Sequence, residues 1–192
     1  MSSPPPHLPA PLFDAETIAI RVRELGTEIR SHYPEGSITL LSILKGSALF
    51  TADLARSVPG EVELSFVHAR SYGDRTTSSG TVELFQLEHE VLAGRRVVVV
   101  DTILDTGRTL EEVVRSVKAA GAADVRTCVL LDKKARRQVD VVPDWIGFET
   151  PDLFLVGYGL DHAGRYRTLA YIGALDGGAL EGGALDEGTP HE

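Results

Sequence analysis

Residues 97–109 read Val-Val-Val-Val-Asp-Thr-Ile-Leu-Asp-Thr-Gly-Arg-Thr. Four consecutive valines are typical of a strand that is buried on both faces of a parallel sheet. A helical pattern follows from about Arg108 to Ala120 and ends at Gly121. The small polar residues between strand and helix predict an anion pocket, because hydroxyls and backbone N–H groups meet at a helix N-terminus. The alternative is a ligand-free turn in which Asp105 caps the helix.

Strands and helices also alternate along the rest of the chain. Asp14 can cap a helix whose apolar residues recur at helical spacing as far as Ile29. Further strand-length patterns lie at 38–44, 62–71, 81–87 and 125–131, and a second helical pattern lies at 49–58. This alternation predicts an α/β fold with a parallel sheet, in which ligands bind beyond the carboxyl ends of the strands. The segments expected there are 45–47, 102–109 and 132–134.

Length and composition limit the classes of protein to consider. The chain has 192 residues, which is enough for about one domain of ordinary size. Its net charge of −9 argues against general nucleic-acid binding. The single cysteine, Cys128, lies in an apolar run and is expected to be a buried structural thiol. No apolar run approaches the ~20 residues that span a bilayer, and the N-terminus does not resemble a signal peptide, so a cytoplasmic protein is expected.

The two ends of the chain differ in composition from its centre. Residues 1–11 are rich in proline and serine, and residues 175–192 are acidic and repeat a Gly-Ala-Leu pattern. Both compositions are typical of disordered segments. The sequence therefore predicts a single domain over 12–174 between a leader and a tail.

The segment 97–109 resembles the phosphoribosyl-pyrophosphate (PRPP) signature of the type I phosphoribosyltransferases. The resemblance continues, in order, through landmarks of the hypoxanthine/guanine phosphoribosyltransferases and covers about residues 14–172. These landmarks are Leu44-Lys45-Gly46-Ser47, Ser71-Tyr72, Lys133, residues 154–161 and Arg167. The resemblance implies the fold of that family, a parallel twisted sheet flanked by helices, with a small hood built from N- and C-terminal segments.

The resemblance also implies how the phosphate and ribose of PRPP are bound. The 5′-phosphate would lie on a loop made of Asp105, Thr106, Gly107, Arg108 and Thr109. Asp105 would also be the catalytic residue, exchanging a proton with purine N7 as general base or acid.

The ribose hydroxyls would meet Asp101 and Thr102, and Asp101 would bind Mg²⁺. The family usually carries two adjacent acids here, whereas this chain carries Asp101 followed by Thr102. The second position therefore departs from the family pattern, and Thr102 can offer a ribose hydroxyl only a neutral hydrogen bond.

On the pyrophosphate side, the resemblance assigns binding to Lys45, Gly46 and Arg167, and a second Mg²⁺ to Asp161. In the family the peptide before this lysine is often cis. On local grounds alone, 45–47 reads equally as an ordinary turn with Ser47 as helix cap. Ser71 and Tyr72 would begin a lid that excludes water, and the alternative for the polar stretch 71–80 is a surface hairpin loop.

At the base site, the resemblance implies that Lys133 donates to O6 of a 6-oxopurine, which would favour hypoxanthine and guanine over adenine. Phe154 would stack on the purine ring, and the main chain of Leu155 would meet the edge of the base. Taken alone, Phe154 reads as a core residue, and Lys133 reads as part of a solvated basic loop.

Together these features lead to the hypothesis of a Mg²⁺-dependent purine salvage enzyme that converts hypoxanthine or guanine and PRPP to IMP or GMP and pyrophosphate. The expected assembly is a homodimer or homotetramer, with no nucleic-acid or membrane partner. Two alternatives remain, a PRPP-sensing regulator on the same fold and a transferase for another base. Three of the six histidines, His68, His89 and His162, lack the spacing of metal ligands and are assigned no catalytic role.

Overall fold

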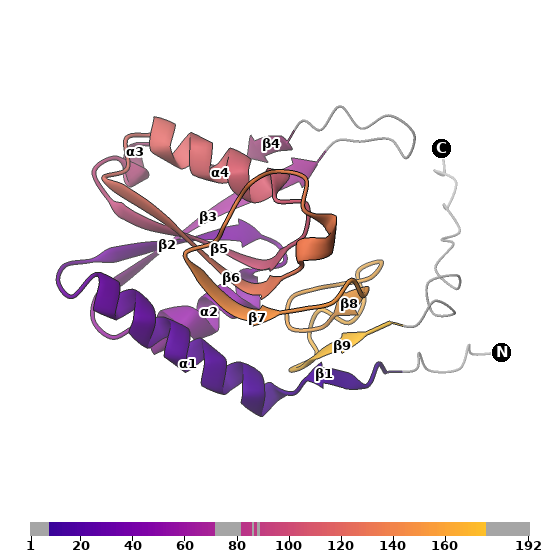
Figure 1. Cartoon of the computed structure of the whole chain (residues 1–192). Coiled ribbons are helices and arrows are strands. Elements are labelled where there is room, and N and C mark those ends of the chain that lie inside the picture. The colour runs from indigo at the N-terminus through magenta and orange to yellow at the C-terminus, as the bar shows by residue number, and fades with distance from the viewer. Residues whose placement is uncertain (1–7, 72–81, 86, 88, 176–192) are drawn as a thin grey trace, which may run out of the picture.

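The computed structural model describes residues 8–71, 82–85, 87 and 89–175. In this part of the chain, six strands form the main sheet, in the order β4-β3-β2-β5-β6-β7 (Figure 1). All neighbours in it run parallel except β4, which is antiparallel to β3. The strands are β2 Ile38–Leu44, β3 Val62–Ser71, β4 Val82–Phe85, β5 Arg96–Leu104, β6 Asp124–Asp132 and β7 Trp145–Glu149. The predicted parallel α/β core is confirmed.

Helices cover both faces of this sheet (Figure 1). The helices are α1 Ala15–His32, α2 Ala48–Ser57, the short α3 His89–Leu92 and α4 Arg108–Ala119, with a 3₁₀ turn at Lys134–Arg136. Residues of α1 and α2 pack with alternate residues of the strands into one buried apolar cluster. Residues of α4 pack with the opposite residues of the same strands into a second cluster. This arrangement explains the four valines of β5, which are all fully buried and serve both clusters in turn.

The first helix forms as the sequence predicts. The Asp14 carboxylate accepts a hydrogen bond of 2.7 Å from the backbone N–H of Thr17, which caps α1. The apolar positions Ile18, Val22, Leu25 and Ile29 are all buried. They place one face of α1 against the sheet and against α2.

The strand β3 is covered on one face, and the covered face is not the more apolar one. Ser65 and Val67 are buried, whereas Leu64 and Phe66 are 48% and 45% exposed. The reason is the position of α2, which packs on β2 and β5. The outer apolar face of β3 therefore remains open in this chain.

A second, smaller sheet forms the expected hood. It joins β1 Pro11–Phe13, β9 Ile172–Ala174 and β8 Leu155–Val156, with antiparallel pairing throughout. This sheet brings the N-terminal and C-terminal segments together beside the main sheet (Figure 1). Residues 1–7 of the expected leader and 176–192 of the expected tail lie outside the described residues, and their disorder stays a prediction. Pro11, the last residue of the expected leader, belongs to β1.

Cys128 lies in the middle of β6 and is fully buried, as the sequence predicts. Burial raises the pKa of its thiol far above the ordinary value, so the group stays protonated. No helix in the described part of the chain is both long enough and apolar enough to span a membrane.

Candidate active site

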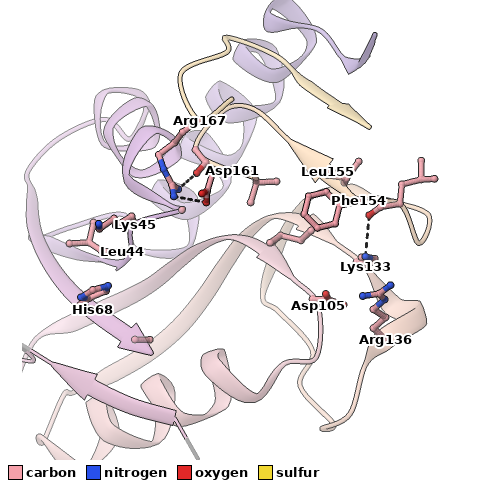
Figure 2. A pocket seen from close by; sticks show the side chains of 16 residues that line it. Leu44, Lys45, His68, Asp105, Lys133, Arg136, Phe154, Leu155, Asp161 and Arg167 are labelled. Atoms are coloured by element: carbon pink, nitrogen blue, oxygen red, sulfur yellow. Dashed lines mark hydrogen bonds and ion pairs between the residues drawn. The ribbon is translucent and has the colours of Figure 1, made fainter. Parts of the chain in front are cut away.

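A cavity of about 430 Å³ opens at the carboxyl ends of β2, β5 and β6. Eight of the residues predicted from the sequence line it together: Lys45, Gly46, Asp105, Lys133, Phe154, Leu155, Asp161 and Arg167. Figure 2 shows the labelled side chains in two groups. One group holds Lys45, Asp161 and Arg167, and the other holds Asp105 and the predicted base-binding residues. Segments that are far apart in the sequence thus meet at one edge of the sheet.

A smaller cavity of about 80 Å³ lies between the end of β5 and the start of α4. Its lining includes Asp101, Asp105, Thr106, Gly107 and Thr109, which are predicted phosphate and ribose residues. Asp105 lines both cavities. Its Oδ1 atom is buried and has no hydrogen-bond partner among the described residues, so it is free to accept a proton or a hydrogen bond from a ligand.

The loop from Asp105 to Gly107 is held by the segment that follows β6. Arg137 donates from Nε to the carbonyl oxygen of Asp105 at 3.2 Å and pairs with the buried carboxylate of Asp132. The backbone N–H of Gln138 donates to the carbonyl oxygen of Thr106 at 2.9 Å. Gly107 has φ +87, and a Cβ there would lie 2.7 Å from the side chain of Val139. The loop therefore requires glycine at this position, both for its backbone angle and for space.

Asp101 and Thr102, which follow the four valines of β5, face opposite sides of the sheet. Asp101 accepts the backbone N–H of Thr102 at 2.7 Å, and burial raises the pKa of its carboxyl to about 7. Thr102 is fully buried, and its hydroxyl has no partner among the described residues. Thr102 and Arg108 line neither cavity, so their predicted contacts with ribose and phosphate stay predictions.

The pyrophosphate side is built by close backbone packing. The peptide between Leu44 and Lys45 is cis, as the family resemblance suggests. Gly159 has φ +99 and lies so close to the carbonyl of Gly46 that a Cβ would be 2.0 Å from its oxygen. Arg167 donates to the carbonyl oxygen of Gly159 and pairs with Asp161 at 2.5 Å. Asp161 and Arg167 are thereby fixed next to the 45–47 loop.

On the base side, Lys133 is 4% exposed, and its Nζ donates to the carbonyl oxygen of Leu153 at 3.1 Å. The same Nζ lies 2.7 Å from Asp152 Oδ1. Lys133 is therefore not part of a solvated loop. Phe154 is 42% exposed and makes an edge contact with the His162 ring, with centroids 5.2 Å apart. A half-exposed ring on a cavity wall is suited to stacking, and the reading of Phe154 as a core residue is wrong.

Of the two predicted lid residues, Ser71 and Tyr72, the structure describes only the backbone of Ser71. Ser71 is the last residue of β3, and Tyr72 lies outside the described residues, so the lid stays a prediction. Among the cavity-lining residues that sequence reasoning missed, two carry titratable side chains, His68 and Arg136. His68 lies within β3 at the last position that pairs with β2, opposite Leu44, where β2 ends at the cavity.

In the described part of the chain, no three or more His, Cys, Asp or Glu side chains gather closely enough to hold a metal ion. Asp101 and Asp161 line different cavities, and in each cavity the other carboxylate is that of Asp105. Such an arrangement could hold a cation only together with oxygens of a bound ligand.

The chain is similar to proteins of known class over most of its length. The family model described as "Phosphoribosyl transferase domain" matches residues 11–163. The hypoxanthine-guanine phosphoribosyltransferase of Bacillus subtilis is 39% identical over 164 residues, covering 85% of this chain and 91% of that protein. The hypoxanthine phosphoribosyltransferase of Haemophilus influenzae is 39% identical over 167 residues, covering 85% of this chain and 93% of that protein.

Solved structures agree with these sequence matches. A crystal structure of a hypoxanthine-guanine phosphoribosyltransferase from Bacillus anthracis aligns with a TM-score of 0.82 at 35% identity, covering 87% of this chain and 98% of that chain. A structure of the hypoxanthine phosphoribosyltransferase from Trypanosoma cruzi also aligns with a TM-score of 0.82, at 33% identity, covering 88% of this chain and 96% of that chain. Sequence, fold and site geometry lead to the same conclusion, and the chain belongs to the phosphoribosyl transferase domain family.

Proposed function

We propose that the protein is a purine salvage phosphoribosyltransferase that converts hypoxanthine or guanine and PRPP to IMP or GMP and pyrophosphate. One observation carries this proposal. A single cavity is lined by a buried lysine, Lys133, by the unpartnered carboxylate of Asp105 and by the cations Lys45 and Arg167. Relatives named for this activity, at 39% identity, support the same assignment.

The base would bind on the side of the cavity that holds Lys133. Its ammonium donates to O6 of a 6-oxopurine, Phe154 stacks on the ring, and the main chain of Leu155 meets the base edge. N9 forms a bond to C1 of the ribose as the bond from C1 to the pyrophosphate oxygen breaks, with inversion at C1. The N7 proton passes to Asp105, whose buried Oδ1 has no competing partner among the described residues.

PRPP would span the two cavities. The 5′-phosphate lies on the loop from Asp105 to Thr109 at the N-terminus of α4, where N–H groups and the helix dipole favour a dianion. Lys45, the backbone of Gly46 and Arg167 bind the pyrophosphate. The ribose hydroxyls would lie between these sites, beside Asp101, while the contact assigned to Thr102 stays a prediction because this residue lines neither cavity.

The carboxylates fit a requirement for Mg²⁺. This ion keeps several waters and takes one or two carboxylates plus substrate phosphate oxygens, so it does not need a cluster of acids. Asp101 would hold one ion against the ribose, and Asp161 would hold a second against the pyrophosphate. When bound, the ions neutralise negative charge that develops on the leaving pyrophosphate.

A second candidate function is a PRPP-binding regulator without catalysis. Thr102 favours it, because a buried neutral side chain stands where the family usually has a second acid. The presence of Asp105, Lys133, Asp161 and Arg167 in one cavity favours the enzyme.

The deciding experiment measures pyrophosphate release from PRPP and Mg²⁺ with hypoxanthine, guanine, xanthine, adenine or uracil. The expected result is turnover with hypoxanthine or guanine that falls about 100-fold or more in Asp105→Asn. Turnover only with adenine or uracil would contradict the base-site assignment. PRPP binding without turnover of any base would instead favour the regulator.

We also propose that the protein assembles as a homodimer or homotetramer. The open apolar face of β3, with Leu64 and Phe66 about half exposed, supports an interface between copies.

A further inference from the structure

The lysine of the base site is held by the segment that also carries the stacking ring. An ammonium group has three N–H donors. Burying the group costs free energy unless these donors are paired with acceptors. Lys133 Nζ uses two of them, one on the carbonyl oxygen of Leu153 at 3.1 Å and one on Asp152 Oδ1 at 2.7 Å. Among the described residues the third N–H has no acceptor, and Lys133 lines the cavity.

Asp152 is itself fixed by a second cation. Its Oδ1 atom lies 2.9 Å from Arg136 Nε as well as 2.7 Å from Lys133 Nζ. The hydrogen bond from Lys133, aided by that from Arg136, holds the pKa of the Asp152 carboxyl below its usual value. The carboxylate is therefore charged at neutral pH and binds the lysine as an ion pair.

The chain between Asp152 and Leu155 links these contacts to the ring of Phe154. Asp152 and the Leu153 carbonyl hold the lysine, the next residue is Phe154, and Leu155 begins β8. The segment is anchored at both ends, by the N–H of Thr150 on the Asp132 carbonyl at 3.0 Å and by the N–H of Leu175 on the Phe154 carbonyl at 2.9 Å. Figure 2 shows Lys133 and Phe154 on the same side of the cavity.

We propose that Asp152 is a specificity-determining positioning residue, which directs the free N–H of Lys133 toward the 6-position of the base. This inference rests on the proposed function. With two N–H groups held by Asp152 and Leu153, the remaining one lies in a defined direction relative to the Phe154 ring. A carbonyl oxygen at the 6-position accepts this hydrogen bond, whereas an amino group presents its own donors and is rejected.

The test compares Asp152→Asn with Asp152→Glu and with Glu149→Gln. Glu149 forms an ion pair with the neighbouring Lys134 that is exposed on both sides, and it lines neither cavity, so its variant controls for the loss of a carboxylate in the same region without loss of a contact to Lys133. Calorimetry measures the dissociation constants of IMP and AMP for each protein. Both nucleotides carry the same ribose and 5′-phosphate, so the ratio of the two constants reports on the 6-position and the adjacent N1, where the two bases differ.

We expect Asp152→Asn to reduce the preference for IMP over AMP about tenfold, which is about 1.4 kcal/mol. The KM for hypoxanthine should rise by a similar factor, while the KM for PRPP and the melting temperature change little. Asp152→Glu should keep most of the preference, because it keeps the charge, and Glu149→Gln should behave as the wild type.

Two results would overturn the inference alone. In one, Asp152→Asn keeps the wild-type ratio of IMP to AMP binding. In the other, the KM values for hypoxanthine and for PRPP rise by the same factor, and the melting temperature falls. That result would indicate an ion pair with a merely structural role. A wild type that neither prefers IMP nor turns over 6-oxopurines would refute the proposed function itself, and the inference with it.

Discussion

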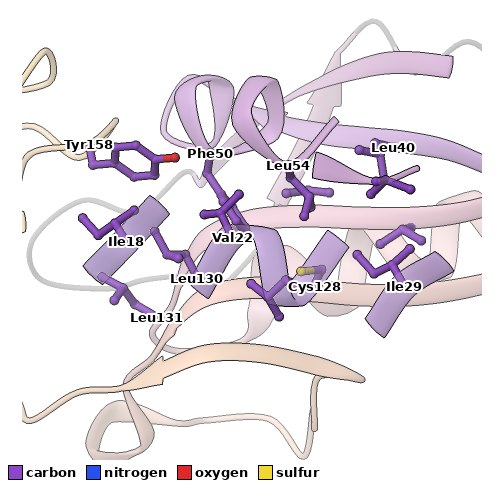
Figure 3. Packing of buried hydrophobic residues seen from close by; sticks show 14 of the residues in the cluster. Ile18, Val22, Ile29, Leu40, Phe50, Leu54, Cys128, Leu130, Leu131 and Tyr158 are labelled. Carbon is purple, nitrogen blue, oxygen red and sulfur yellow. The ribbon is translucent and has the colours of Figure 1, made fainter. Parts of the chain in front are cut away.

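The Tyr158 hydroxyl donates a hydrogen bond of 2.6 Å to Asp53, which joins the Gly157–Asp161 segment to the middle of α2. Tyr158 is buried, and Figure 3 shows its ring at the end of the α1–α2 cluster, near Phe50. The helix α2 begins directly after the 45–47 loop. The contact therefore ties the loop that would bind pyrophosphate to the segment that carries Asp161.

Replacing Tyr158 by Phe removes this hydrogen bond and keeps the ring. We expect the KM for PRPP to rise about fivefold, because a typical hydrogen bond contributes about 1 kcal/mol. The KM for hypoxanthine should stay within twofold, since the base lies on the other side of the cavity. Steady-state kinetics with each substrate varied in turn would measure both values.

Tyr33→Phe is the matched control for that variant. Tyr33 makes an equally short hydrogen bond, 2.6 Å, to Asp124, at the start of β6 and away from the cavity. It should lower stability without changing either KM. Equal changes of the two KM values in Tyr158→Phe would contradict the positioning role.

A second prediction concerns the close approach of Gly159 to Gly46. An added Cβ would lie 2.0 Å from the Gly46 carbonyl oxygen, so Gly159→Ala must displace the 45–47 loop. We expect the KM for PRPP to rise about tenfold or more, and unfolding in urea to show a loss on the order of 2 kcal/mol.

Gly121→Ala is the control that separates the cost of placing alanine at a positive φ from the effect of the close contact between residues 159 and 46. Gly121 also has a positive φ, +82, but in the described structure its Cβ would meet no atom within 4 Å. The free energy of unfolding of Gly121→Ala should be roughly 1 kcal/mol lower than that of the wild type, and its KM for PRPP should be unchanged. If both alanine variants raised this KM equally, the contact with Gly46 would not explain the effect.

The third prediction is a pH dependence of stability from Tyr33 and Asp124. The hydrogen bond from Tyr33 lowers the pKa of the Asp124 carboxyl. A carboxyl whose pKa is lowered by folding adds stability above its unfolded pKa, near 4, and this gain is lost as the pH falls through the folded value. Tyr33→Phe should therefore lower the free energy of unfolding by about 1 kcal/mol at pH 7 and by less at pH 3.

Urea unfolding of wild type and Tyr33→Phe at pH 7, 5 and 3 would measure this difference. The difference in unfolding free energy should begin to shrink below about pH 4, where the Asp124 carboxyl of the unfolded chain takes up a proton, and should shrink further as the pH falls through the lower pKa of the folded state. An equal loss at pH 7 and pH 3 would mean that the variant disturbs packing and that the charge on Asp124 has no part in it.

Local signals explain how much of the fold could be predicted. The strand at Ile38–Leu44 and the Asp14 cap were readable because apolar spacing and a single capping side chain decide them. The strand that ends at Asp101 was readable only in part, since β5 continues through polar residues to Leu104. Pairing with β6 extends it to Leu104, whereas its pairing with β2 ends at Val100, and such pairing is not visible in the local sequence pattern.

The site was predictable where a motif lies at the carboxyl end of a strand. Asp152 was not, because its role depends on a contact with Lys133 across a loop and a strand, and an acid after a proline carries no local signal. The open face of β3 was also hidden from the sequence. Alternation predicts one covered face, but which face is covered depends on where α2 packs.

That open face leads to the last prediction. Leu64 and Phe66 lie on the same side of β3 and are 48% and 45% exposed, which is unusual for large apolar side chains in the middle of a sheet. We expect light scattering to give a dimer or tetramer mass for the wild type and a monomer mass for Phe66→Glu, since a charge at this position is costly to bury. Val142→Glu is the control, because Val142 is 80% exposed in the segment between the 3₁₀ turn and β7. A wild-type monomer, or a Phe66→Glu protein that keeps the wild-type mass, would show that this face is not the interface.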